Sequence, residues 1–325
     1  MKKIRVLAAA LTAMLSMTWV APALAQAAYP SKPIRFIVPY PPGGANDTLA
    51  RLVAQKMTEG LGQQVIVDNR PGASGVIGLD AVAKAPADGH TLGLAINTFV
   101  INASIMPKLP YDTDKDFTPV ASLASSAFLM AVNSKVPVND LKGFVALARQ
   151  KPGSLNYGTV GSAGIGRLVG EMFSMNADVQ VTQIPFKGSA QLLTSLVSGD
   201  VDFVIDTANV YLPHIAEGKV RPIAVPGDAR LVGLPDVPTF AELGMPKFDV
   251  RMWFGALAPA GVSPEIVKKL SAELARVMAL PDVQTRLAQM EIRPFVQDSA
   301  QFGAFLKAEM AKYAEIIKTA NIKPE

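Results

Sequence analysis

The chain contains no cysteine and only two histidines among its 325 residues. Disulfide bonds are therefore excluded, and the fold must be held together by its hydrophobic core. A lipid-modified cysteine, which anchors some exported proteins, is excluded as well. A metal site would need mostly carboxylate ligands. We therefore expect no metal centre.

Several enzyme motifs are also missing. Ser162 lacks the glycine two residues earlier that a nucleophile elbow requires, because Val160 stands there. Gly164-Ile165-Gly166 is not followed by the third glycine of a dinucleotide-binding motif, since Val169 occupies that position. No phosphate-binding GK[ST] sequence occurs. The sequence therefore predicts neither a nucleotide cofactor nor an enzyme.

Long hydrophobic runs are absent except at the N-terminus. There, three basic residues precede the apolar run Val6–Val20, and Ala23-Leu24-Ala25 is a typical cleavage site. The run is too short for a transmembrane anchor, and it ends in a cleavage site, so we do not expect it to span a membrane. We expect residues 1–25 to be a signal peptide and the mature, periplasmic protein to begin near Gln26.

Excess charge of either sign is small in the predicted mature chain. The full chain has 31 Lys and Arg against 27 Asp and Glu, and the signal peptide holds three of the basic residues and no acidic one. The remainder is 28 basic against 27 acidic residues. No basic tract remains, so we expect no nucleic-acid partner.

Strand and helix patterns alternate along the chain. The expected strands are 34–38, 64–67, 91–96, 127–132, 155–158, 181–185, 201–205 and 221–225. The expected helices are 47–61, 72–84, 141–150, 164–175, 190–198, 264–279 and 300–320, with Ser299 as the cap of the last. This order predicts the α/β class, with mostly parallel sheets flanked by helices.

The alternation occurs in two units, which indicates two lobes. The chain is expected to cross near Ser122–Ser126 and to return near Arg251–Phe254. Residues 26–124 with 252–325 would form domain 1, and residues 125–251 would form domain 2. A ligand cleft is expected between them.

The first candidate binding segment follows the strand at 34–38 and opens a helix. Its glycines let a ligand approach the backbone, and the N–H groups of the helix start attract a small anion. An ordinary strand-to-helix turn remains open as the alternative, with Asp47 accepting N–H groups to brace it. The candidate residues are Tyr40, Gly43, Gly44, Ala45 and Asp47.

A second segment of similar design precedes the helix at 164–175. Its hydroxyls and backbone N–H groups can donate to carboxylate oxygens, although a flexible glycine turn is the alternative. The candidate residues are Thr159, Ser162, Ala163 and Gly164. Two helix starts that face each other across a cleft would hold an anion from both sides.

Charged and polar side chains add further candidates. Arg167 stands near a helix N-terminus, where a cation is unfavourable; it either pairs with Glu171 or binds a second ligand carboxylate. Asp206 ends an apolar strand and either caps the next helix or lines the cleft. Asn97 and Thr98 are weaker candidates of the same kind.

From Tyr29 almost to the C-terminus, the chain resembles the Bug, or TctC-like, periplasmic receptors of tripartite tricarboxylate transport. Each motif is modest alone, but together and in order they are specific to that family. They are YPSKPIRFIVPYPPGGANDTLAR, VDNRPGASGVIG, LPYDTDKDFTPV, KPGSLNYGTVGSAG, PFKGSAQ, LPDVPTFAELG and WFGALAPAG.

The resemblance implies a two-lobed, type II periplasmic-binding-protein fold that closes on small carboxylates. It implies that the segments Gly43–Asp47 and Gly161–Gly164 hold one ligand carboxylate and that Asp206 lines the cleft. Many relatives have histidine where this chain has Arg167. We expect Arg167, with Lys187, to favour a dicarboxylate.

The sequence thus predicts a monomeric binding protein that delivers a small carboxylate to membrane transporter subunits by transient docking. A receptor that signals to a two-component sensor is the alternative. An exported hydrolase is the third possibility, and the missing catalytic motifs argue against it.

Overall fold

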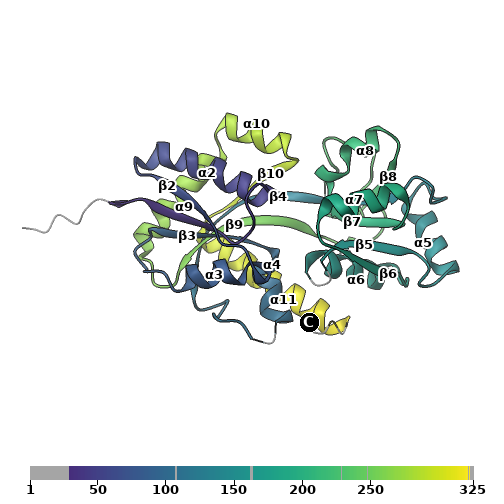
Figure 1. Ribbon diagram of the computed structural model, residues 1–325, viewed down its shortest axis with the longest axis horizontal. Coiled ribbons are helices and arrows are strands. Elements are labelled where there is room, and N and C mark those ends of the chain that lie inside the picture. The colour runs from purple at the N-terminus through teal and green to yellow at the C-terminus, as the bar shows by residue number, and fades with distance from the viewer. Residues whose placement is uncertain are drawn as a thin grey trace, which may run out of the picture.

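The computed structural model describes residues 29–106, 108–161, 164–227, 229–246, 248–320 and 322 (Figure 1). The predicted signal peptide lies outside these ranges, as do the candidate site residues Ser162 and Ala163. Within the described ranges, no helix combines the length and apolar character that crossing a membrane requires.

Two α/β bodies lie end to end and are linked through long strands (Figure 1). The sheet of the first body has the order β2-β1-β3-β9-β4, with β10 paired to β4. Strands β1 and β2, and β1 and β3, are parallel, whereas β9 and β4 run antiparallel to their neighbours. These strands are β1 (Ile34–Val38), β2 (Val65–Asn69), β3 (Thr91–Ile96), β4 (Phe117–Asn133), β9 (Arg251–Pro259) and β10 (Ile292–Gln297).

Helices flank the sheet of the first body (Figure 1). They are α2 (Ala45–Leu61), α3 (Val76–Ala83), α4 (Asn97–Ile105), α9 (Pro264–Met278), α10 (Pro281–Gln289) and α11 (Ser299–Thr319). Helix α2 buries Leu49, Val53 and Met57, which recur at helical spacing, and it ends at Gly62 in the left-handed conformation.

The second body uses the far half of β4, which pairs with β7 and β8. Strand β5 lies parallel to both β6 and β7. The strands are β5 (Asn156–Val160), β6 (Thr182–Phe186), β7 (Phe203–Thr207) and β8 (Val220–Ala224), and the helices are α5 (Leu141–Gln150), α6 (Ile165–Ala177), α7 (Ser189–Ser198) and α8 (Leu212–Ala216). The predicted α/β class is confirmed. The exact domain boundaries stay a prediction, since β4 runs through both sheets.

Some elements differ from the sequence prediction. Strand β4 begins at Phe117, well before the expected residue 127, because its first half is rich in Ala, Ser and Pro and carries little strand signal. Helix α4, helix α10 and strand β10 were not expected. Helix α4 is apolar on most of its surface and mostly buried, so it lacks the amphipathic pattern that identifies surface helices.

The predicted cap of the last helix is wrong by one residue. Asp298 accepts a hydrogen bond from the Gln301 N–H, and the Gln301 side chain accepts one from the Asp298 N–H. This reciprocal pair is a capping box. The Ser299 hydroxyl instead donates to the Pro119 carbonyl at 2.6 Å and ties α11 to β4.

Apolar contacts join the two bodies as well as the strands. Helix α6 of the second body contacts both α4 and α11 of the first. One cluster of buried side chains runs from Phe99 through Leu168 and Phe173 to Ile317. Each such side chain, when fully buried, contributes about 1.5–3 kcal/mol, so this contact stabilises the observed arrangement of the bodies.

Candidate functional site

The candidate site lies where the parallel strands of both bodies end. Strands β1, β2 and β3 lead into α2, α3 and α4, while β5 and β6 lead into α6 and α7. Parallel strands place their carboxyl ends at one edge of a sheet, where ligands commonly bind. Figure 1 places α4 and α6 on the facing sides of the two bodies, and these helices are in contact. The helices that follow the two sheet edges are therefore neighbours.

The first loop, Gly43–Asp47, is held in shape by the Asp47 carboxylate. That group accepts hydrogen bonds of 2.9 Å each from the Gly43 N–H, Arg51 Nε and Asn69 Nδ2. Gly43 has a φ of 86°, a conformation that favours glycine. The interpretation of Asp47 as a brace thus agrees with the geometry. With its acceptors engaged and its side chain buried, it is poorly placed to touch a ligand itself.

The start of α2 leaves donors free for a ligand. Gly44 is the N-cap and provides no side-chain cap, so the N–H groups of Ala45 and Asn46 have no partner within the helix. Gly43, Gly44 and Ala45 are exposed, and a Cβ built on either glycine would meet nothing within 4 Å. A carboxylate can therefore reach this backbone at the positive end of the helix dipole.

Electrostatics keep the brace ionised. The hydrogen bond from Arg51 is the largest contribution that lowers the pKa of Asp47, to about 2, with further lowering from Gly43 and Asn69. Burial acts in the opposite direction and is outweighed. The Asp47 carboxylate is thus charged at neutral pH, and its negative charge interacts with donors of the loop and of its neighbours, Arg51 and Asn69.

Tyr40 and Thr98 join the ends of β1 and β3. Their hydroxyls are 2.7 Å apart and form a hydrogen bond. Burial raises the pKa of the Tyr40 hydroxyl, which keeps it neutral. Both residues are partly exposed, so they remain candidates to line the site.

Asn97 does not fit the predicted ligand-binding role. It is fully buried, its amide donates at 3.0 Å to the Arg251 carbonyl and to the Tyr313 hydroxyl, and its carbonyl accepts from the Trp253 N–H at 3.2 Å. All of its polar atoms are engaged within the protein. Asn97 therefore fastens the end of β3 to β9 and α11.

A third loop, Pro71–Gly75, was missed as a site candidate. It follows β2 and opens α3, and Ala73, Ser74 and Gly75 all have positive φ, which is strained for the two residues that are not glycine. The Asn102 side-chain amide donates a hydrogen bond of 3.1 Å to the Ser74 carbonyl. A Cβ on Gly75 would lie 3.3 Å from the Tyr40 hydroxyl, so this loop adjoins the first. The two glycines in the sequence RPGASG, residues 70–75, could have indicated this loop from the sequence alone.

In the second body, Gly161 and Gly164 flank the second loop with φ values of 76° and 130°. Gly164 is the N-cap of α6 and, like Gly44, provides no side-chain cap. The N–H groups that begin α6 therefore repeat the arrangement at α2. Ser162 and Ala163 lie outside the described residues, so their predicted contacts remain predictions.

The predicted contact between the Thr159 hydroxyl and a ligand is not supported. Thr159 is 2% exposed; its hydroxyl donates to the Gly161 carbonyl at 2.8 Å and accepts from the Gln183 amide at 2.9 Å. A hydroxyl has a single proton, and here the loop itself uses it. Thr159 shapes the second loop from beneath.

Arg167 is the third residue of α6 and forms no ion pair with Glu171 among the described residues. The pairing interpretation is therefore not supported. Its Nε is buried and has no hydrogen-bond partner in the described ranges. An unsatisfied buried donor costs about 1–3 kcal/mol, and the helix dipole adds to the cost of a cation here. A ligand oxygen would remove both costs.

Asp206 lies at the end of β7 and caps neither of the following short helices. Its carboxylate accepts from the Thr207 N–H at 2.7 Å and from the Tyr211 hydroxyl at 3.0 Å. Burial raises the pKa of Asp206 more than these hydrogen bonds lower it. Lys187, after β6, is exposed beside the start of α7.

The arrangement can bind an anion, and it offers no metal site in the described part of the chain. No group of three or more His, Asp or Glu there could hold a metal ion. Two uncapped helix starts, one in each body, and one guanidinium with a free donor are suited to a molecule with two negatively charged ends.

Comparison with known proteins gave consistent matches. The family model described as "Tripartite tricarboxylate transporter family receptor" matches residues 49–322. The Bordetella pertussis protein BugT is 33% identical over 297 residues, covering 91% of each chain.

Two solved structures of Rhodopseudomonas palustris proteins are also similar. Rpa4515 with adipate has a TM-score of 0.80 and 34% identity, covering 91% of this chain and 100% of that one. MatC with bound malate has a TM-score of 0.75 and 32% identity, covering 89% of this chain and 100% of that one.

Proposed function

Because this chain belongs to the tripartite tricarboxylate transporter family of periplasmic receptors, we propose that it captures a small dicarboxylate for uptake. The unpaired Nε of Arg167 at the start of α6 is the observation that carries the proposal, together with the uncapped start of α2 in the other body. One ligand carboxylate would bind the N–H groups of the first loop. The other would bind Arg167.

The ligands of the relatives support this chemistry. Rpa4515 was solved with adipate and MatC with malate, and both molecules are dicarboxylates. A bidentate contact between guanidinium and carboxylate is among the strong charge-assisted interactions, and it fixes the orientation of the ligand. Lys187, exposed at the same sheet edge, adds positive charge near the second carboxylate.

The test is a calorimetric titration of the mature protein with mono-, di- and tricarboxylates. We expect dicarboxylates to bind most tightly. Arg167→Gln should weaken dicarboxylate binding by about tenfold or more and leave monocarboxylate binding nearly unchanged, whereas Arg167→Lys should recover part of the loss.

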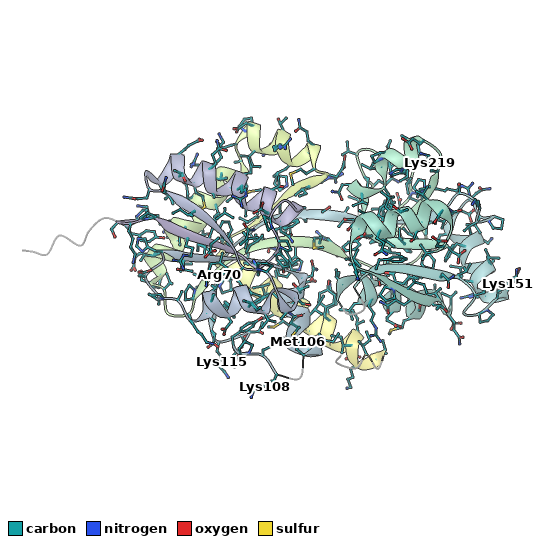
Figure 2. The ribbon with its side chains drawn as sticks, viewed as in Figure 1. Arg70, Met106, Lys108, Lys115, Lys151 and Lys219 are labelled. Atoms are coloured by element: carbon teal, nitrogen blue, oxygen red, sulfur yellow. The ribbon has the colours of Figure 1, made fainter. Side chains whose placement is uncertain are left out.

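Lys151→Gln is a matched control, because Lys151 is exposed at the far end of the second body (Figure 2). It should bind like the wild type. Equal losses for mono- and dicarboxylates in Arg167→Gln would contradict the assignment of the second carboxylate to Arg167. An absence of binding by every acid would overturn the proposed function.

Delivery to a transporter is part of the proposal and needs its own test. Deleting the gene should abolish uptake of the labelled ligand and leave the transcriptional response to it intact. The reverse result would favour the receptor that feeds a two-component sensor. N-terminal sequencing of the periplasmic protein should begin near Gln26 if residues 1–25 are removed on export.

A further inference from the structure

A cavity lies in the first body, between α11, α4 and the chain that enters β4. Its volume is about 510 Å³, within the range of sites for small molecules. Its floor is apolar and buried: Phe99, Phe117, Leu257 and Leu306 are at most 6% exposed. Lys115, on the turn that borders the cavity, lies at the lower edge of the first body in Figure 2.

The cavity exists because α11 presents small residues to it. Ala300, Gly303 and Ala304 lie on one face of the helix and line the cavity opposite Pro119. A Cβ on Gly303 would come no closer than 3.6 Å to Pro119 Cγ. Larger side chains would fit here and would fill the space.

The rim carries polar groups that the protein leaves without partners. Thr113 lines the cavity, and its hydroxyl is shielded from solvent and has no hydrogen-bond partner in the described chain. Asp114 and Lys307 also line the cavity and are exposed. In the described ranges, neither of these charged groups takes part in a salt bridge.

The charges on the two sides of the rim are opposite. Asp114 belongs to the turn Asp112–Asp116, which contains three aspartates and one lysine and is therefore acidic. Lys307 comes from α11 and supplies a positive charge. A ligand that satisfies both sides needs a cationic group, an anionic group and an apolar portion.

We propose that this cavity binds an apolar α-amino acid in its zwitterionic form. The ammonium group would lie at Asp114, the carboxylate at Lys307, and the side chain against Phe99 and Phe117. The edge-to-face pair of these rings, 5.1 Å between centroids, offers an apolar surface that suits an aromatic or branched side chain.

The experiment is a calorimetric titration with L-phenylalanine and L-leucine. Both should bind, whereas phenethylamine, 3-phenylpropionate and glycine, which each lack one of the three features, should bind at least about tenfold more weakly. Gly303→Leu should abolish binding by filling the cavity. Lys307→Gln and Asp114→Asn should each weaken it about tenfold.

Two controls separate this site from the one between the bodies. Lys318→Gln removes a cation further along α11 and should leave amino-acid binding unchanged. Arg167→Gln should also leave it unchanged, and Gly303→Leu should retain dicarboxylate binding. Loss of amino-acid binding in Arg167→Gln would place the amino acid in the other site and overturn the proposal. Absence of any binding, or equal binding of phenethylamine and phenylalanine, would overturn it too.

Discussion

At the scale of single residues, polar side chains beside strand ends divide into braces and free donors. The braces are Asp47, Asn97 and Thr159, whose side chains form hydrogen bonds within the protein. Arg167, in contrast, has a buried donor without a partner among the described residues. The sequence predicted all four in the strand-to-helix segments where the structure also has them. It could not separate them, because Asn97 bonds to residues more than 150 positions away.

Asp47→Asn should lower stability in a pH-dependent way. The pKa of Asp47 is about 2 in the folded protein and 3.8 in the reference state, so its contribution is fully present above pH 4 to 5 and is lost as the pH falls toward 2. We expect the free energy of unfolding to fall by about 1–2 kcal/mol at pH 7. This figure is smaller than the full pKa shift implies, because Arg51 is half exposed and water screens the ion pair.

Urea denaturation at a series of pH values measures this effect. The difference between wild type and Asp47→Asn should shrink between pH 4 and pH 2. Asp236→Asn, which alters an exposed carboxylate, should differ little from the wild type at any pH. A difference for Asp47→Asn that stayed constant with pH would refute the assigned electrostatic role.

At the scale of elements, periodicity predicted amphipathic helices well and buried or irregular elements poorly. Helix α5 was predicted at its observed bounds, Leu141–Gln150, because a buried face alternates with an exposed one. Helix α4 and the first half of β4 are buried on most sides, so the periodic signal is weak there. The D-x-x-Q pattern before α11 was a readable capping signal one residue upstream of Ser299.

Asp298→Ala should destabilise the protein by about 0.5–2 kcal/mol because it removes the capping box of α11. Hydrogen exchange at the Gln301 amide reports the loss directly, since that N–H donates to Asp298. Ser299→Ala is the matched comparison: it removes the bond to Pro119 but should leave the Gln301 amide protected. Faster exchange in Ser299→Ala than in Asp298→Ala would show that the cap is misassigned.

At the scale of the whole molecule, the two candidate binding loops lie on different bodies, so we expect a bound ligand to affect how the bodies are arranged. Strand β4 and the chain entering β9 link them, and contacts of α6 with α4 and α11 add an apolar connection. Helix α6 starts at the second loop. A ligand that bridges the two loops would therefore act on the contacts of α6 with α4 and α11. Ligand binding is therefore expected to shift the arrangement of the bodies.

Because the chain has no cysteine, two can be introduced for dye labelling without competing thiols. Lys115→Cys with Lys151→Cys places one dye on each body (Figure 2). A bound dicarboxylate should change the energy transfer between them. Lys151→Cys with Lys219→Cys, both on the second body in Figure 2, should show no change. An unchanged signal in the first pair at saturating ligand would exclude closure.

The sequence by itself determined the α/β class, the order of most elements and the glycine-rich loops at helix starts. These features depend on local patterns of apolar residues and on backbone conformations that glycine permits. Only the tertiary structure decided which polar groups remain free, because Asn97 and Thr159 are satisfied by distant partners while Arg167 is not. It alone also revealed the cavity beneath α11, since Phe99, Thr113 and Gly303 meet only when β4, α4 and α11 pack together.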